Sequence, residues 1–226
     1  MRGEVPLSQV GILISGRGSN MVALLDAMDR GEIPARCSLV ISNKADAPGL
    51  ALAAARGVPT LVIDHKASAT REEHDAKVVT ALREAGVEIV CLAGYMRLLS
   101  PVFVRAFKDR ILNIHPALLP AFPGLHVQRK ALDAGARFSG CTVHLVDEEV
   151  DHGPILLQAV VPIFPDDDEE SLSRRILGLE HHLYAAALRL MCEGRVTVDG
   201  SRAVLDVPHT EYQRLSGGLI WSGDSQ

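Results

Sequence analysis

Short aliphatic runs recur at regular intervals along the first half of the chain, and this alternation is what most constrains the fold. The runs cover residues 10–14, 39–42, 61–63 and 89–93. Segments of about 20 residues separate them, which is the spacing of β-α-β units. The pattern predicts an α/β fold in which a mostly parallel, doubly wound sheet carries helices on both faces.

Two of the intervening segments have an apolar stripe at helical spacing. The stripes consist of Met21, Val22, Leu24, Leu25 and Met28 in the first segment and of Val78, Val79, Leu82 and Ala85 in the second. Apolar side chains three or four positions apart share one face of a helix, so we expect these faces to cover the sheet. Gly31 and Gly86 stand where the two helices should end.

The pattern changes in the C-terminal half, where strand-like runs at 142–146 and 155–161 are separated only by a loop. Such a pair favours an antiparallel hairpin. A long helix with a buried stripe should follow the acidic run at 165–170. Because negative charge stabilises the start of a helix, we interpret the acidic run as a cap rather than as a metal site.

The composition excludes several classes of protein. Hydrophobic residues make up 47% of the 226 residues and the formal net charge is -5, which indicates a folded chain without the basic face that general nucleic-acid binding requires. Cys37, Cys91, Cys141 and Cys192 form no C-x-x-C pair and fit buried thiols in a reducing cytoplasm. No signal peptide is visible, and no apolar stretch approaches the roughly 20 residues of a membrane helix. We expect a soluble, cytoplasmic protein.

Asn113 and His115 belong to an apolar run that Pro116 stops. Alternate side chains of a strand share a face, so both should point to the same side, opposite to their apolar neighbours. Asp151 follows in an acidic loop. An amide, an imidazole and a carboxylate can together polarise a carbonyl, move a proton and hold the proton carrier, which indicates group transfer. The alternative is a capped strand end with a structural histidine.

A short glycine-containing turn at residues 15–20 links the first strand to the first helix. Such a turn exposes backbone N–H groups at a helix start, where anions bind. Met21 replaces the third glycine of a dinucleotide motif, and no lysine follows as in a P-loop. The turn therefore favours a single phosphate monoester, and a tight connection without a ligand is the alternative. The candidate phosphate-binding residues are Arg17, Gly18, Ser19 and Asn20.

Five motifs follow one another along the chain. They read ISGRGSN at 14–20, SNKADA at 42–47, LAGYMRLLSP at 92–101, NIHPALLP with FPGLH at 113–126, and GCTVH with DHGP at 140–154. In this order they resemble the phosphoribosylglycinamide formyltransferases, the folate-dependent enzymes of purine synthesis, over nearly the whole chain. The chain departs from the family pattern at Arg17, Ala117 and His152, where Asn, Ser and Gly are frequent.

The resemblance implies an activity and a set of site residues. The activity would be formyl transfer from 10-formyltetrahydrofolate, a co-substrate, to glycinamide ribonucleotide, without a metal. The catalytic residues would be Asn113, His115 and Asp151, while residues 18–20 would bind the nucleotide phosphate and Glu180 its ribose. The residues lining the folate pocket would be Arg71, Met96, Arg97, Leu98, Leu99, Asn113, Asp147, Val150 and Asp151.

We therefore expect one formyltransferase domain over residues 1–226. Residues 1–100 would form a phosphate-binding β-α-β half, residues 101–215 a catalytic and folate half, and residues 216–226, rich in Gly and Ser, a loose tail. The expected partners are the two small-molecule substrates, without nucleic acid or membrane. The protein would be a monomer or a homodimer.

Other functions stay open. A formyltetrahydrofolate hydrolase or a methionyl-tRNA formyltransferase would share the Asn, His and Asp residues, although the resemblance implies an added domain in each that 226 residues would not hold. A non-catalytic phosphate- or nucleotide-binding module would need the turn but not the three polar residues together. His144 is either a partner of the acidic loop or a buried core residue, and no H-E-x-x-H motif indicates a metal.

Overall fold

The computed structural model describes residues 6–215, and a seven-stranded sheet forms their centre. The strand order is β3-β2-β1-β4-β5-β6-β7. Pairs among β1 to β5 are parallel, whereas β6 pairs antiparallel with both β5 and β7. The strands are β1 (Ser8–Ile14), β2 (Ala35–Ser42), β3 (Thr60–Val62), β4 (Ile89–Leu92), β5 (Ile111–His115), β6 (Phe138–Leu145) and β7 (Ile155–Pro162). The predicted mostly parallel sheet and its antiparallel hairpin are both confirmed.

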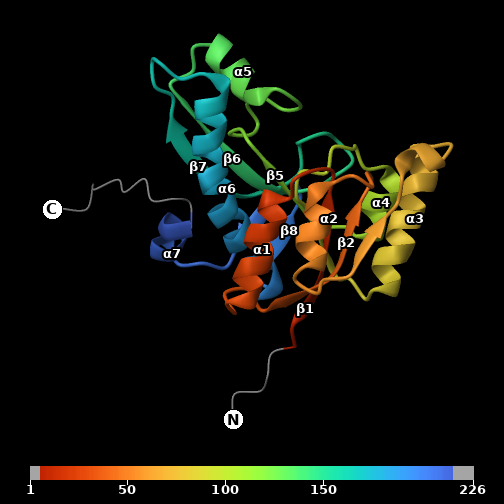
Figure 1. Cartoon of the computed structure of the whole chain (residues 1–226). Coiled ribbons are helices and arrows are strands. Elements are labelled where there is room, and N and C mark those ends of the chain that lie inside the picture. The colour runs from red at the N-terminus through yellow and green to blue at the C-terminus, as the bar shows by residue number, and fades with distance from the viewer. Residues whose placement is uncertain (1–5, 216–226) are drawn as a thin grey trace.

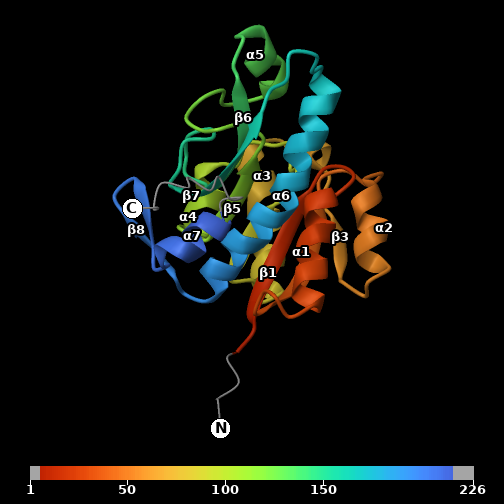
Figure 2. The ribbon, with the colours of Figure 1, turned by 90° about the vertical axis from the view of Figure 1, so that its left-hand side faces the viewer.

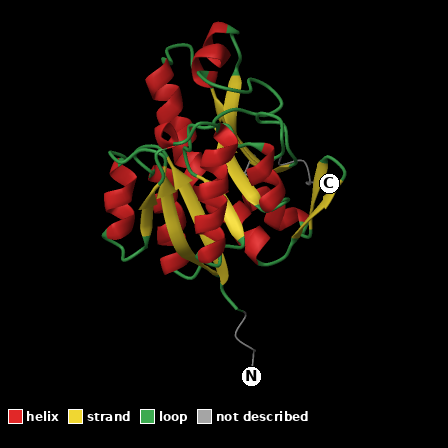
Figure 3. Ribbon diagram, turned by 90° about the vertical axis from the view of Figure 1, so that its right-hand side faces the viewer, coloured by secondary structure: helices red, strands yellow, loops and turns green. Residues whose placement is uncertain are grey.

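Helices cover both faces of this sheet, as predicted (Figure 1 and Figure 3). The long helix α6 lies beside α1 on one face (Figure 2), and α3 and α4 pack on the other. The helical elements are α1 (Ser19–Asp29), α2 (Pro48–Ala54), the 3-10 helix η1 (His65–Ala67), α3 (Arg71–Glu84), α4 (Pro101–Ala106), α5 (Val127–Asp133), α6 (Glu169–Cys192) and α7 (His209–Leu215).

The first strand shows why the sheet is buried on both sides. Val10, Ile12 and Ile14 belong to the core beneath α1 and α6, whereas Leu13 belongs to the core beneath α3. Side chains alternate between the two faces of a strand, so a strand covered on both faces must be apolar at nearly every position. At Gly11 an added Cβ would lie 2.5 Å from Cδ2 of Leu82, so glycine lets α3 pack against the strand backbone.

Several local predictions are confirmed. Gly31 and Gly86 adopt the left-handed conformation (φ 71° and 69°) just after α1 and α3, where a glycine ends a helix without strain. The acidic run caps α6, because the Asp168 carboxylate accepts a hydrogen bond from the Ser171 amide at 2.8 Å. Cys37, Cys91 and Cys141 are buried free thiols as predicted, whereas the free thiol of Cys192 is only partly buried.

A second, two-stranded sheet was not predicted. It consists of β8 (Val196–Asp199) and β9 (Arg202–Leu205), and Figure 3 shows it set apart from the central sheet. The turn contains Gly200, which has a positive φ of 59° after Asp199. The two-residue turn is Gly200-Ser201, and a Gly-Ser pair between alternating polar and apolar residues is a recognised hairpin signal, so the sequence did contain this information. The predicted loose tail, residues 216–226, lies outside the described residues.

The strand order places a crevice between β1 and β4. From β1 the chain adds β2 and β3 on one side, and then β4 and β5 on the other. The connections that leave the carboxyl ends of β1 and β4 therefore diverge, and ligands of open α/β sheets bind at such a point. The phosphate-turn candidate follows β1, and residues 96–99 follow β4.

Tyr184 links helix α6 to strands β4 and β5 by hydrogen bonds. Its hydroxyl is fully buried and donates to the carbonyl oxygens of Leu92 (3.1 Å) and Leu112 (3.0 Å). These residues lie on β4 and β5, and Leu112 directly precedes Asn113. The position of the β5 backbone next to Asn113 is thus fixed by a buried hydrogen bond to α6 as well as by apolar packing.

Two glycine substitutions test this packing. An added Cβ at Gly140 on β6 would lie 1.9 Å from the Ala159 carbonyl oxygen, whereas one at the exposed Gly178 on α6 would meet nothing within 4 Å. We expect Gly140→Ala to lower the free energy of unfolding by roughly 3 kcal/mol. Gly178→Ala should raise it by about 0.5–1 kcal/mol, because alanine loses less backbone entropy in a helix. Urea denaturation followed by circular dichroism measures both, and a Gly140→Ala protein as stable as the parent would contradict the packing described.

Candidate active site

The end of β5 presents two polar side chains on one face, as predicted. Leu112 and Ile114 pack into the core beneath α1 and α6, so Asn113 and His115 point to the opposite side. In the antiparallel pairing with β6, Asn113 lies opposite His144. The strand therefore brings an amide and two imidazoles to one end of the sheet.

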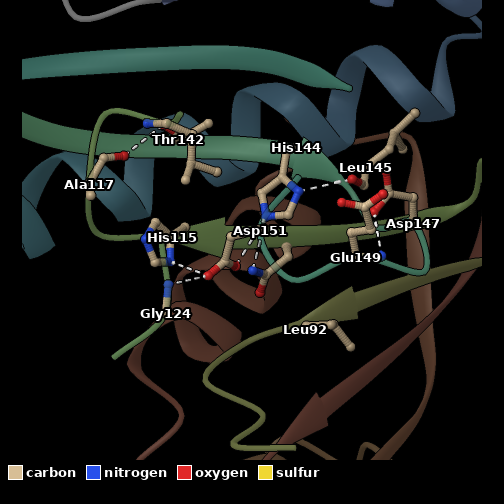
Figure 4. A network of polar contacts seen from close by, with 12 residues as sticks. Leu92, His115, Ala117, Gly124, Thr142, His144, Leu145, Asp147, Glu149 and Asp151 are labelled. Atoms are coloured by element: carbon tan, nitrogen blue, oxygen red, sulfur yellow. Dashed lines mark hydrogen bonds and ion pairs between the residues drawn. The ribbon is translucent and has the colours of Figure 1, made fainter. Parts of the chain in front are cut away.

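Asp151 reaches this point from the loop between β6 and β7. Its carboxylate Oδ2 lies 3.4 Å from His115 Nδ1 and accepts a hydrogen bond from the Gly124 amide at 2.8 Å, while Oδ1 lies 3.8 Å from His144 Nε2 (Figure 4). The Asp151 side chain is 12% exposed. The structure thus brings Asn113, His115 and Asp151 together, as the sequence predicted.

The loop that carries Asp151 depends on close approaches of its backbone. Asp151 has a positive φ of 53°, a conformation that aspartate tolerates better than most residues. At Gly153 an added Cβ would lie 2.1 Å from the Leu145 carbonyl oxygen. Only glycine lets the loop return this close to β6, and the return directs the carboxylate toward the two histidines.

His144 orients the amide of Asn113. The carbonyl oxygen of Leu145 can only accept, so His144 Nδ1 donates to it at 2.9 Å, and Nε2 is left to accept from Asn113 Nδ2 at 3.1 Å. Burial lowers the pKa of His144, which keeps the ring neutral and Nε2 free to accept. Both interpretations of His144 are correct: the side chain is buried, and it contacts the loop carboxylate.

Both nitrogens of His115 face acceptors. Nδ1 faces the Asp151 carboxylate, and Nε2 donates to the Phe122 carbonyl oxygen at 3.0 Å. A protonated imidazolium therefore finds an acceptor at each N–H, which suits a group that carries a proton. The Phe122 carbonyl was not predicted as part of the site, because a backbone oxygen leaves no signal in residue type.

The turn after β1 has the geometry of an anion site. Gly18, at the N-cap of α1, is left-handed (φ 72°), and no side chain caps this end of the helix. Arg17 and Ser19 are exposed beside it. The first N–H groups of a helix are unpaired within the helix and lie at the positive end of its dipole, so they favour an anion.

Glu180 of α6 lies next to this turn, as predicted. Asn20 Nδ2 donates to its carboxylate at 2.7 Å, and both side chains are buried. Burial raises the pKa of Glu180, while the bond from Asn20 acts in the opposite direction. This hydrogen bond joins residues 160 positions apart in sequence and fixes α6 against the start of α1.

The predicted folate residues lie in separate segments. Met96 and Leu98 are 66% and 55% exposed on the segment after β4, and Arg71 is exposed at the start of α3. A cavity of about 200 Å³ beside the loop of Asp151 includes only Val150 and Asp151 of the predicted set. Its other lining residues are Leu119, Pro120, Pro123, Glu149, His152 and Ile155.

His152, where the chain departs from the family pattern, has a defined contact. Its Nδ1 lies 2.9 Å from Oδ2 of Asp147 across the acidic loop, and this bond raises the pKa of His152. The pair is solvent-exposed, and exposed ion pairs contribute little to stability.

Neither a metal site nor a membrane span is found in the described part of the chain. Within residues 6–215 no three His, Cys, Asp or Glu side chains gather in a way that could hold a metal ion. No helix in the same range has the length and apolar character needed to cross a bilayer.

Comparison with known proteins agrees with this geometry. A model of the formyl transferase family matches residues 8–188. Phosphoribosylglycinamide formyltransferase of Haemophilus influenzae is 42% identical over 200 residues, which cover 88% of this chain and 94% of that protein. The crystal structure of glycinamide ribonucleotide transformylase 1 from Symbiobacterium toebii superposes with a TM-score of 0.87 and 49% identity, over 90% of this chain and 95% of that one.

A longer relative is also similar. The trifunctional purine biosynthetic protein adenosine-3 of Drosophila pseudoobscura pseudoobscura is 53% identical over 191 residues. The match covers 84% of this chain but only 14% of the length of that protein. By its family match, its relatives and its fold, this chain belongs to the formyl transferase family.

Proposed function

We propose that the protein transfers a formyl group from 10-formyltetrahydrofolate to the amine of glycinamide ribonucleotide, a step of purine synthesis. The observation that carries the proposal is the convergence of Asn113, His115 and Asp151 at one end of the sheet, near a turn suited to a phosphate monoester. The names of the relatives in Haemophilus influenzae and Symbiobacterium toebii support the same reaction.

The amide of Asn113 serves the first half of the reaction. The substrate amine attacks the formyl carbon with its lone pair, and the carbonyl electrons move onto oxygen. One N–H of Asn113 Nδ2 is directed to His144, which leaves the second N–H to donate to the developing oxyanion. A donor held in place before the reaction loses no orientation energy when the charge forms.

His115 carries the proton. As the carbon–nitrogen bond to the folate breaks, its electron pair returns to the folate nitrogen, which must gain a proton. The attacking nitrogen loses a proton at the same time. His115 can accept one and donate the other, directly or through water, while the Asp151 carboxylate holds the ring and favours its charged form. Because His115 Nε2 is hydrogen-bonded to the Phe122 carbonyl oxygen, the reacting groups of the substrates must displace this oxygen before they can exchange a proton with Nε2.

The two substrates would bind on either side of this centre. The amides of residues 18–20 receive the nucleotide phosphate with Arg17 beside them, and Glu180 accepts hydrogen bonds from the ribose. Arg71, residues 96–99 and the loop of residues 147–151 line the folate site. Holding both reactants in one orientation contributes to the rate by itself.

The proposal extends to the organisation and the location of the protein. The chain acts as one domain, as a monomer or homodimer, with a phosphate-binding half at residues 1–100 and a catalytic and folate half at residues 101–215. The four unpaired thiols support a reducing cytoplasm. The reaction uses no metal, since the groups described supply both the oxyanion donor and the proton carrier.

A competition assay separates this function from its rivals. Purified protein receives 10-formyltetrahydrofolate together with glycinamide ribonucleotide, water and charged initiator tRNA as acceptors, and each product is quantified. We expect formyl glycinamide ribonucleotide as the dominant product. Formate or formylated tRNA as the main product would assign the hydrolase or the tRNA enzyme instead, and ligand binding without turnover would indicate a binding module.

Substitution of the proton carrier tests the mechanism. We expect His115→Ala and Asp151→Asn to lower turnover by roughly 10²- to 10⁴-fold, because each removes part of the acid-base system. In His115→Ala, binding of a folate analogue, measured by calorimetry, should change little. His182→Ala is a control, because this histidine is exposed on α6 and the charged group that it influences is Glu32, which is not a site residue. Near-normal turnover in either site variant would refute the assignment.

Glu180→Gln tests the ribose contact. Glutamine keeps the shape and can still accept from Asn20, but it loses the charge-assisted bond to a hydroxyl. Because hydrogen bonds to charged groups are worth about 1.5–3 kcal/mol, we expect the KM for the nucleotide to rise about tenfold or more. The KM for the folate should stay within about twofold of the parent's, and an equal change in both constants would contradict a ribose contact.

The same variant tests the raised pKa of Glu180. As the pH rises above 4.5, the ordinary pKa of a glutamate, Glu180 loses its proton in the unfolded state before it does so in the folded state. The free energy of unfolding therefore decreases as the pH rises through this range. Glutamine has no such dependence. The stability of Glu180→Gln relative to the parent should therefore increase with pH above 4.5, by at most about 1.4 kcal/mol for each unit by which the pKa is raised. Urea denaturation from pH 4.5 to 8 measures this difference, and a decrease with pH would show that the carboxylate is stabilised instead.

A further inference from the structure

One buried hydroxyl joins the two substrate regions. Ser15 directly follows β1, is the first residue of the phosphate turn at residues 15–20, and is only 5% exposed. Its Oγ donates to Oδ1 of Asn43, after β2, at 2.6 Å. The same Oγ accepts a hydrogen bond from the Met96 amide, after β4, at 2.8 Å. The carboxyl ends of three neighbouring strands thus meet at one side-chain oxygen.

The bond that Ser15 donates to Asn43 fixes the orientation of its hydroxyl. A serine hydroxyl has a single hydrogen, and Ser15 uses it toward the buried Asn43. Its lone pairs are therefore turned away from Asn43 and available to the Met96 N–H. A freely rotating hydroxyl would hold the amide less well, so Asn43 makes Ser15 a fixed acceptor.

A backbone hydrogen bond joins Ser15 to the segment after β4 at a second point. The Ser15 amide donates to the Gly94 carbonyl oxygen at 3.1 Å, two residues before Met96. Gly94 has a positive φ of 76°, which turns the chain at the end of β4 back toward Ser15. Residues 94–96 are therefore hydrogen-bonded at two points to the residue that leads into the phosphate turn.

Helix α3 contacts the residues that flank the same segment on both sides. Asp75 Oδ2 accepts from the Ser100 amide at 2.6 Å, and His74 Nε2 bonds to the Tyr95 hydroxyl at 2.9 Å. Asp75, His74 and Ser100 have no exposed surface. Residues 96–99 are thus fixed at both ends, but only the attachment at Ser15 leads to the phosphate turn.

We propose that Ser15 is a positioning residue that sets the folate-binding segment, residues 96–99, in register with the phosphate turn. This inference rests on the proposed function, since it assumes that the turn binds the nucleotide and the segment binds the folate. It assigns Ser15 no contact with either substrate. A hydroxyl that fixes both regions relative to each other determines whether the amine and the formyl carbon meet in a reactive orientation.

The test compares two buried serines. Ser15→Ala removes the bond to the Met96 amide. Ser42→Ala is the matched control, because Ser42 is equally buried at the end of β2 and its hydroxyl also both donates and accepts, but only with Lys44. Both proteins are measured for turnover, for the KM of each substrate, for nucleotide affinity by calorimetry and for thermal stability.

We expect Ser15→Ala to change kcat and the KM for the folate but not the Kd for the nucleotide. In Ser15→Ala, kcat should fall about tenfold and the KM for the folate should rise about fivefold, because the segment loses one buried hydrogen bond and its fixed placement. The Kd for the nucleotide alone should change less than about twofold, since the backbone amides of the turn remain. Ser42→Ala should keep all kinetic constants within about twofold of the parent's.

Three outcomes would overturn the inference: unchanged kinetics in Ser15→Ala, equal losses in both serine variants, or a loss confined to nucleotide affinity. If Ser15→Ala does not fold, the same constants decide the question in Ser15→Cys, which keeps the volume but replaces the hydroxyl by a weak acceptor. A parent protein that transfers no formyl group to glycinamide ribonucleotide would refute the proposed function rather than the role of Ser15 alone.

Discussion

The Asp151 carboxylate contacts three segments of the chain that meet at the end of the sheet. Its oxygens face His115 at the end of β5, the Gly124 amide in the loop after β5, and His144 on β6. A largely buried carboxylate is costly unless donors lie close to it, and here the Gly124 amide donates to it and His115 Nδ1 lies 3.4 Å from it. The placement of the loop therefore depends on the end of β5 and on the segment that follows β5.

Side chains of the same chemical type make different hydrogen bonds in the site because their surroundings differ. His144 is buried and its Nδ1 donates to a backbone carbonyl, so it stays neutral and accepts from Asn113. His115 faces acceptors on both sides, the Asp151 carboxylate at Nδ1 and the Phe122 carbonyl oxygen at Nε2. Of the two carboxyl groups, Asp151 lies among donors, whereas Glu180 is buried with the Asn20 amide as its partner. Environment, rather than residue type, separates His115, the proposed proton carrier, from His144, which orients Asn113.

Much of the fold could be predicted because burial on both faces requires apolar strands, and apolar strands are visible as runs. The shared face of Asn113 and His115 followed from the period of a strand, and their meeting with Asp151 followed from the family resemblance. The contacts of Phe122 and Ser15 could not be predicted, since one is made by a backbone oxygen and the other by a hydroxyl that only tertiary structure brings to Met96. The β8–β9 ribbon was missed although its Gly200-Ser201 turn was visible.

The close approach at Gly153 extends the functional site beyond the residues that take part in the chemistry. The strand oxygen opposite this glycine leaves no room for even a methyl group, so any replacement would lift the adjoining acidic bend off the sheet. Intolerance of change at this position would thus reflect a steric limit in the scaffold. A search for ligand contacts based only on mutational sensitivity would wrongly include it.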